Sequence, residues 1–133
     1  MSYIRLYILA FCFVAVGIVD VSAQADVIKN VRTAIKTGSS KELVKYMNNT
    51  VELTFDGTKS SYSKTQAEFV LKDFFKKYPP KDFQYIHQGA SREEGLKYVI
   101  GKYTFESGSF RVYMLFKQFK GRYMVDLIDF SKE

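Results

Sequence analysis

A change of hydrophobic period at Pro79-Pro80 constrains the fold of this chain more than any other feature. Before these prolines, apolar residues recur mostly at spacings of three and four, which is typical of helices. After them, apolar and polar residues alternate, which is typical of strands. Proline cannot donate a backbone hydrogen bond within a helix, so the last helix must end here. The sequence therefore predicts an α+β fold, with helices first and an antiparallel sheet after them.

Three helices and one strand are expected in the first half. Ser39 with Glu42, and Ser63 with Gln66, have the spacing of a capping box, a pair of reciprocal side-chain to backbone hydrogen bonds at a helix start. The helix after Ser63 has the strongest apolar stripe in the chain. The expected helices cover 27–35, 39–47 and 64–78, and the expected strand covers 51–55.

The second half is expected to form a meander of four strands. Two of its connectors, Ser107-Gly108 and Lys120-Gly121, suit tight hairpin turns because glycine accepts a positive φ. The sheet should curl around the helix over 64–78, which needs a partner for its apolar stripe. The expected order is α-α-β-α-β-β-β-β, and the four strands are Phe83–Ser91, Leu96–Phe105, Ser109–Phe119 and Arg122–Ser131.

Two-residue turns at these connectors also predict which side chains share a face, since a slip of one residue would turn a whole strand over. They pair Tyr103 with Val112, and Val112 with Asp129. The inner face, against the helix, then carries Val99, Tyr103, Phe105, Phe110, Val112, Met114, Phe116, Tyr123, Val125 and Leu127.

Asp129 is the acidic residue predicted on this inner face, where an isolated carboxylate is costly to bury. One hypothesis is that the cone has an open end lined by Asp129 and four other candidates, Gln84, Gln88, Tyr103 and Tyr123. The alternative is that the last strand frays after Ile128 and leaves Asp129 in solvent.

The opposite face is expected to be too apolar for a solvated sheet surface. We therefore predict a homodimer packed sheet to sheet. The alternative is that a loop or the N-terminal helix covers this face. The candidate dimer residues are Tyr85, His87, Tyr98, Ile100, Tyr113, Leu115 and Phe130.

Residues 1–23 have the three-part pattern of a secretory signal peptide: Arg5, an apolar run over 6–19, and small residues ending at Ala23. Cleavage there would leave a single domain over 24–133, periplasmic or secreted, without a transmembrane segment. A membrane anchor, or a lipoprotein attached at Cys12, is the alternative. Cys12 is the only cysteine, so the mature chain would have no disulfide.

The formal net charge of +6 raises the question of nucleic-acid binding. Lysine and arginine are scattered singly between apolar residues, and exported proteins rarely meet nucleic acid, so we expect none. His87 is the only histidine, and without a mature cysteine a zinc site is not expected. No motif for a cofactor is present, and no cofactor is expected.

This order of elements resembles the nuclear-transport-factor-2-like, or cystatin-like, cone fold. The strand over 121–130 looks like the usual last strand of that superfamily, with Tyr123 in place of the commoner tryptophan. Stretches 62–68 with 71–75, 79–83 and 108–113 resemble a family of exported bacterial proteins known only as a domain of unknown function. The resemblance covers nearly all of the mature chain and implies fold and compartment, but no activity. Because the superfamily includes isomerases, dehydratases and non-catalytic modules, the fold alone does not decide the function.

The first functional hypothesis is a non-catalytic module that binds a small ligand or a protein. One alternative is an isomerase- or dehydratase-type enzyme, with Asp129 as general acid/base and Tyr103 donating a hydrogen bond to a developing oxyanion. The other is a protein that binds a polyanion or the cell envelope through its positive charge.

Overall fold

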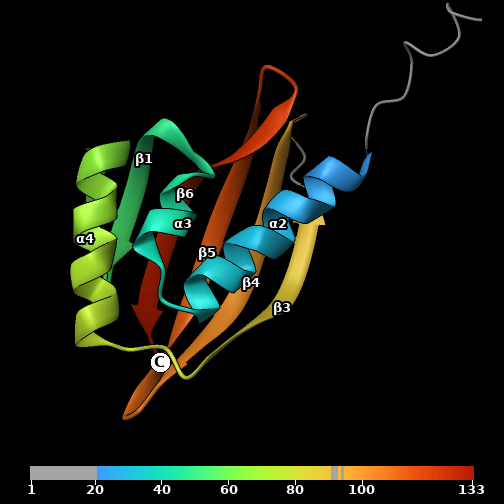
Figure 1. Ribbon diagram of the computed structural model, residues 1–133. Coiled ribbons are helices and arrows are strands. Elements are labelled where there is room, and N and C mark those ends of the chain that lie inside the picture. The colour runs from blue at the N-terminus through green and yellow to red at the C-terminus, as the bar shows by residue number, and fades with distance from the viewer. Residues whose placement is uncertain (1–20, 91–92, 94) are drawn as a thin grey trace, which may run out of the picture.

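The computed structural model of the chain describes residues 21–90, 93 and 95–133, and side chains from Asp26 onward. Figure 1 shows the elements in order. The helices are α2 (Val21–Lys36), α3 (Ser40–Val44) and α4 (Lys64–Lys77), and the strands are β1 (Met47–Phe55), β2 (Thr58–Ser63), β3 (Asp82–Ala90), β4 (Leu96–Phe105), β5 (Gly108–Phe119) and β6 (Arg122–Lys132).

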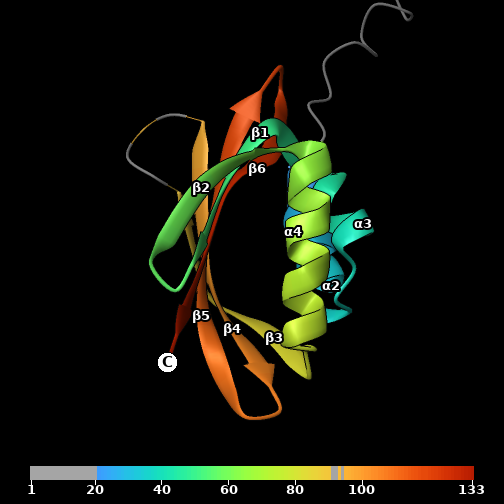
Figure 2. The same cartoon turned by 90° about the vertical axis from the view of Figure 1, so that its left-hand side faces the viewer.

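The strands form one curved sheet in the order β2-β1-β6-β5-β4-β3. All neighbouring pairs are antiparallel except β1 with β6, which is parallel. Figure 2 shows that the three helices cover one face of this sheet and leave the other uncovered. Within this layer, α2 contacts β3 and β6, whereas α4 contacts β1 and β2. The predicted α+β fold, with a curved sheet around a long helix, is therefore confirmed.

Both helices start at their predicted capping serines, but the predicted capping box is complete only at α4, since the Glu42 side chain at α3 bonds Lys45 instead. The Ser63 side chain accepts a hydrogen bond from the Gln66 backbone N–H (3.2 Å), and the Gln66 side chain accepts one from the Ser63 N–H (3.1 Å). Ser39 accepts a hydrogen bond from the Glu42 N–H at the start of α3. At the other end of α4, the Tyr78 N–H donates to the Phe74 carbonyl, and the two prolines follow.

The predicted elements of the first half differ from the structure at α2, which starts at Val21 rather than at residue 27, and in two further places. A strand that the sequence did not predict, β2, pairs with β1 through a turn at Asp56-Gly57, where both residues have positive φ. β2 is a largely exposed edge strand with a polar sequence, so it has no hydrophobic period to detect. The second helix is also shorter than predicted, because Met47 already belongs to β1 and lies in the core.

The predicted turn at Ser107-Gly108 is wrong by one residue. The turn residues are Glu106 and Ser107, so Phe105 pairs with Gly108 and Tyr103 pairs with Phe110. This shifts the pairing of β4 with β5 by two positions, which leaves the side chains of these two strands on their predicted faces. The turn at Lys120-Gly121 forms as predicted, with positive φ at both residues.

A β-bulge in β6 overturns the predicted orientation of the end of this strand. Phe116 pairs with Val125, but Leu115 pairs with Leu127, so Asp126 is left over between them. One extra residue turns the rest of the strand over. As a result Ile128 and Phe130 lie in the core with 0% exposure. Leu127 and Asp129 therefore lie on the outer face, contrary to the prediction.

A second bulge, in β3, has the same kind of effect. Tyr85 pairs with Gly101 and His87 pairs with Ile100, which leaves Ile86 unpaired and 65% exposed. Tyr85 therefore lies on the helix side, where its hydroxyl donates to the Ile28 carbonyl of α2 at 2.5 Å. The position predicted for Tyr85, on the outer face, is wrong.

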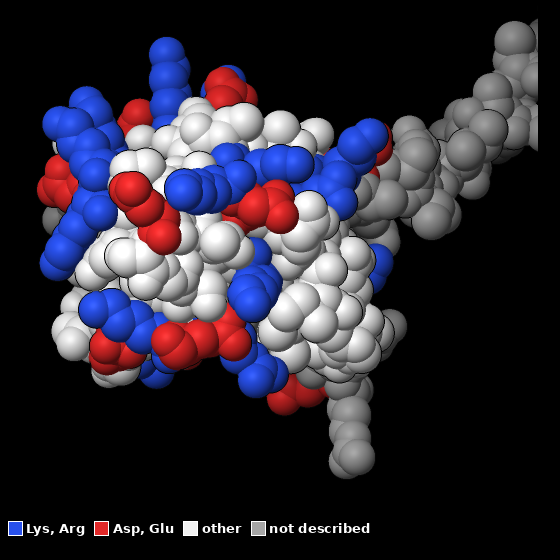
Figure 3. Space-filling view, turned by 90° about the horizontal axis from the view of Figure 1, so that it is seen from below, with Lys and Arg blue, Asp and Glu red and all other residues white. Residues whose placement is uncertain are grey.

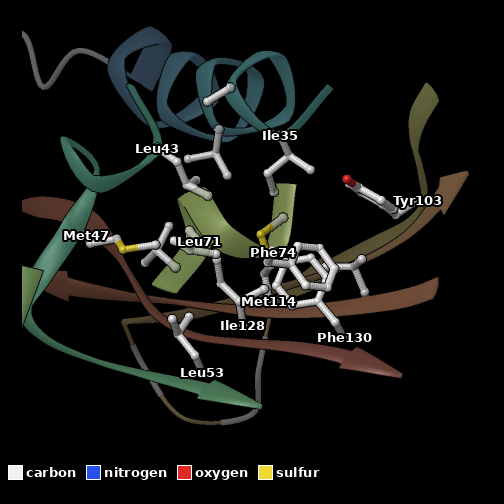
Figure 4. Close-up of a cluster of buried hydrophobic side chains, with 14 of the residues drawn as sticks. Ile35, Leu43, Met47, Leu53, Leu71, Phe74, Tyr103, Met114, Ile128 and Phe130 are labelled. Carbon is white, nitrogen blue, oxygen red and sulfur yellow. The ribbon is translucent and has the colours of Figure 1, made fainter. Parts of the chain in front are cut away.

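The interior between helices and sheet is filled with side chains (Figure 4). Phe74 of α4 is its centre, because its ring centroid lies 4.4 Å from that of Phe130 and 5.7 Å from that of Tyr103. Met114 and Ile128 rise from the sheet, and both are fully buried. No buried side-chain nitrogen or oxygen among the described residues lacks a hydrogen-bond partner.

Most of the predicted leader lies outside the described residues. Its last three residues, 21–23, form the first turn of α2, and cleavage after Ala23 remains a prediction. None of the helices in the described part of the chain is both long enough and apolar enough to cross a membrane.

Candidate functional site

A cleft of about 380 Å³ opens between α4 and the sheet, near the ends of β1 and β6. We call it the α4–sheet cleft. One wall is the second half of α4, and the other is formed by the β1–β2 turn, the start of β5 and the end of β6. The lining residues are Phe55, Asp56, Val70, Asp73, Phe74, Lys77, Tyr78, Phe110 and Lys132.

The helix wall is a consequence of helical spacing. Val70, Phe74 and Lys77 recur at intervals of four and three, which puts them on one side of α4. Asp73 is one turn before Lys77 on the same side. Tyr78 caps the helix, and its carbonyl accepts a hydrogen bond from the buried Tyr103 hydroxyl. Burial raises the pKa of Tyr103, so this hydroxyl stays protonated and keeps donating.

Backbone and side-chain hydrogen bonds fix the sheet wall. The Asp56 N–H donates to the Phe130 carbonyl at 2.7 Å. The Asp56 carboxylate in turn accepts a hydrogen bond from the Lys132 backbone N–H at 3.3 Å. The β1–β2 turn is thus tied to the end of β6, and Asp56 and Lys132 are held side by side on this wall.

The floor of the α4–sheet cleft is aromatic. Phe110 and Phe74 are almost fully buried, whereas Phe55 and Tyr78 are half-buried. The Phe55 and Phe74 centroids are 5.2 Å apart, and those of Tyr78 and Phe110 are 4.9 Å apart in an edge-to-face arrangement. These contacts hold the rings in place, and only Phe55 and Tyr78 keep part of their surface open to a ligand.

Four charged side chains surround this floor, two of each sign. The Lys77 and Lys132 ammonium groups lie 5.4 Å and 5.8 Å from the centroid of the Tyr78 ring. Asp56 and Asp73 supply the negative charges. Within the described part of the chain, no ion pair joins any two of these four side chains. Figure 3 views the molecule from the end at which α4 finishes, and there basic and acidic side chains alternate around uncharged surface.

The chemistry of the lining is that of a binding site with aromatic, ammonium and carboxylate groups. Across the described residues, no group of three or more histidine, cysteine, aspartate or glutamate side chains is placed to hold a metal ion. The cleft can therefore offer apolar surface and ion pairs to a ligand.

The pocket predicted from the sequence does not assemble. Asp129 pairs with Tyr113 on the outer face and accepts a hydrogen bond from Ser131, whereas Tyr103 is buried under the helices. The sheet separates these two residues, so the acid/base pair predicted for an enzyme does not form. Of the other pocket candidates, Gln84 is exposed and pairs with Lys102 of the outer face.

The remaining two pocket candidates lie on the inner side but away from the cleft. Gln88 pairs with Val99 and borders a separate hollow of about 250 Å³ next to Ile28 of α2. Tyr123 packs against the core, with the Lys97 ammonium 4.7 Å from the centroid of its ring. Neither contributes to the α4–sheet cleft.

Most of the predicted dimer candidates do share the outer face. His87 Nε2 lies 2.8 Å from the Tyr98 hydroxyl, and the Tyr98 ring stacks on that of Tyr113 with centroids 6.3 Å apart. Tyr85 and Phe130 are the exceptions, and both belong to the helix side because of the two bulges. We define the outer-face patch by the apolar residues Tyr98, Ile100, Tyr113, Leu115 and Leu127.

Sequence reasoning missed the charged residues of the cleft, namely Asp56, Asp73, Lys77 and Lys132. They stand in a turn, on a helix and at a strand end, and no local pattern connects them. The only signal for them in the sequence is Asp56-Gly57, because aspartate and glycine are common in turns and this turn forms part of the sheet wall.

A family model described as "Domain of unknown function (DUF4783)" matches residues 28–131. The chain belongs to this family. A family protein from Bacteroides ovatus is similar in sequence and structure, with 35% identity over 78% of this chain and 93% of that chain, and a TM-score of 0.74. A second, from Bacteroides uniformis, has 30% identity over 79% of this chain and 95% of that chain, also with a TM-score of 0.74.

Beyond the family, the fold is shared more widely. An uncharacterised protein with a cystatin-like fold from Caulobacter vibrioides has 12% identity, covers 84% of this chain and 88% of that chain, and gives a TM-score of 0.65. At this identity the likeness shows the fold alone, and it confirms the cystatin-like architecture predicted from the order of elements. No curated protein matches the chain. The family carries no assigned activity, so a functional proposal must come from the site.

Proposed function

We propose that this protein is an exported binding module that holds a small, largely apolar molecule in the α4–sheet cleft. The observation that carries the proposal is the cleft itself, about 380 Å³ with a floor of four aromatic rings. Pockets for small molecules have volumes of about 300–1,000 Å³ and are lined mainly by apolar side chains with a few polar groups. The cleft falls at the lower end of this range, so a small ligand is expected.

The filled interior supports this location. Phe74, Met114 and Phe130 occupy the space that a hollow cone would offer to a ligand. An internal cavity would leave those side chains without packing partners, which is unfavourable. Binding in the α4–sheet cleft needs no such change, because the half-buried rings of Phe55 and Tyr78 are already partly exposed there.

A neutral fluorescent probe tests the proposal without assuming a charge on the ligand. Phenylnaphthylamine should gain fluorescence with the mature domain and saturate. Val70→Trp should abolish this gain, because the larger side chain fills the cleft from α4. Phe69→Trp is the matched control, since Phe69 is the neighbouring residue, is 64% exposed and does not line the cleft.

Two results would contradict the proposal. The first is that the wild-type domain gives no saturable signal with the probe. The second is that Val70→Trp and Phe69→Trp bind it equally well. In either case the aromatic floor would be only the edge of the core.

A second candidate function, self-association through the outer-face patch, has its own observation. Tyr113 is 37% exposed at the centre of a sheet face that no helix covers, and it stacks on Tyr98. Exposed apolar area of this kind commonly marks an interaction surface. We propose that two copies pack outer face to outer face.

Sedimentation velocity at several concentrations tests this second candidate. The wild-type domain should approach the mass of a dimer at micromolar concentration, and Tyr113→Lys should be a monomer. Phe69→Lys, which alters an exposed ring on α4 instead, should remain dimeric. A wild-type domain that stays monomeric at hundreds of micromolar would refute self-association.

A further inference from the structure

We infer that the α4–sheet cleft selects a zwitterion with an apolar side group, the chemistry of a free aromatic amino acid or of a very short peptide. This inference rests on the proposed function and adds the charge of the ligand to it. Its basis is the pattern of charges around the cleft, which the apolar floor alone does not explain.

Each wall of the cleft carries one acid and one base. The helix wall has Asp73 and Lys77, separated by one turn, or about 6 Å along the axis of α4. The sheet wall has Asp56 and Lys132, held together by the hydrogen bond between the Lys132 backbone N–H and the Asp56 carboxylate. The formal charge of the lining is therefore zero, but both signs are present on both sides.

These charges are available to a ligand. Within the described residues, the ion pairs of this protein lie elsewhere, and neither lysine ammonium comes within 4.0 Å of the Asp56 or Asp73 carboxylate. The ammonium groups of Lys77 and Lys132 instead lie against the Tyr78 ring, a weak contact at an exposed site. A ligand charge would therefore not have to displace an existing ion pair.

The presence of two lysines and two aspartates in the cleft disfavours ligands that carry a charge of a single sign. A simple anion would meet the carboxylates of Asp56 and Asp73 as well as the lysines, and a simple cation would meet both lysines. A like charge at short range opposes binding in a partly desolvated cleft. A zwitterion satisfies one acid and one base, while its side group covers the exposed parts of the Phe55 and Tyr78 rings.

The probes that test this inference are phenylalanine and three derivatives of the same shape. At neutral pH, phenylalanine is a zwitterion, N-acetylphenylalanine an anion, phenylalaninamide a cation and N-acetylphenylalaninamide neutral. In calorimetric titrations of the mature domain, phenylalanine should bind most tightly. Loss of one charge should weaken binding about threefold, the factor expected of a partly exposed ion pair.

Single substitutions then connect each charge to its partner. Lys77→Met should weaken phenylalanine binding about threefold. It should not weaken the binding of phenylalaninamide, because this cation has no carboxylate to pair with Lys77 and is relieved of a like charge. Asp73→Asn should weaken phenylalanine binding but not the binding of N-acetylphenylalanine, because this anion has no ammonium group to pair with Asp73 and is relieved of a like charge. Lys76→Met and Glu68→Gln are the matched controls on α4, since neither residue lines the cleft, and both should bind like the wild type.

The outcomes separate this inference from the proposed function. Equal affinity for all four probes, with phenylnaphthylamine still bound, would overturn the zwitterion and keep the binding module. Tightest binding of the anion would overturn it too, and would assign the cleft to its lysines alone. If neither phenylnaphthylamine nor any phenylalanine probe binds, both proposals are refuted.

Discussion

Replacement of Phe74 by alanine tests directly how the interior of this domain is held together. Truncating a buried phenylalanine costs about 3–5 kcal/mol of unfolding free energy. Alanine returns about 0.5 kcal/mol because it is the better helix former. Phe74 is 8% exposed at the edge of the cleft, so water can enter part of the space and the low end applies, a net loss of about 2.5 kcal/mol. The aromatic rings that would lose their packing against Phe74 are those of Phe55, Phe75, Tyr78, Tyr103, Phe110 and Phe130.

Urea unfolding followed by circular dichroism measures this loss. With a denaturant dependence of about 1.5 kcal/mol per molar, the midpoint should fall by about 2 M. Phe69→Ala is the control on the same helix, and it should change stability by no more than about 0.5 kcal/mol because Phe69 is 64% exposed. If Phe74→Ala does not fold, Phe74→Leu should, with a loss of about 1.5 kcal/mol or less. A loss below about 1 kcal/mol in Phe74→Ala, similar to that in Phe69→Ala, would refute the view that this ring organises the interior.

Three further predictions follow from the bulge, the buried tyrosine and the leader. Insertion of one alanine between Leu127 and Ile128 should prevent folding, because it would turn Ile128 and Phe130 out of the core. Asp126→Ala removes only a 3.3 Å hydrogen bond from Asn48 and should fold, and equal circular dichroism spectra of the two variants would refute this. Burial raises the pKa of Tyr85, so above pH 10 the folded state keeps the hydroxyl proton while the unfolded state loses it. Above pH 10 the free energy of unfolding should therefore fall by up to about 1.4 kcal/mol per pH unit, and Tyr85→Phe should reduce this pH dependence. Intact-mass measurement of protein from the host envelope should give an N-terminus at Gln24, and a chain that retains residues 1–23 would contradict cleavage.

The parts of the fold that the sequence predicted correctly are those with a local physical cause. Ser63 with Gln66 predicted the start of α4, and the two prolines predicted its end. Lys120-Gly121 predicted a turn because glycine accepts a positive φ, and both Gly121 and Lys120 have positive φ in the turn that forms. Each of these signals acts within a few residues, so no knowledge of tertiary structure was needed.

The errors have a tertiary cause. The prediction of sheet faces from alternating apolar and polar residues assumes that neighbouring strands pair without a bulge. The bulges at Ile86 and Asp126 each insert one residue, which reverses the face on which the following side chains lie. Asp129 was therefore predicted inside and lies outside. β2 escaped detection because an exposed edge strand needs no apolar face. The cleft was not predictable because Asp56 and Lys132 meet only when β1 and β6 pair.

The parallel pairing of β1 with β6 has a consequence for the order in which the domain folds. Met47 and Val125 are neighbours in the sheet although most of the domain lies between them in sequence. Closing so long a loop has an entropic cost that comes before the contact is made, and folds rich in such non-local contacts fold slowly. The β3–β6 meander and the β1–β2 hairpin can each form from short turns, but the sheet is completed only when β1 pairs with β6. Until then the free edge of β6 is exposed, and in this interval the chain is most prone to pair with another copy of itself.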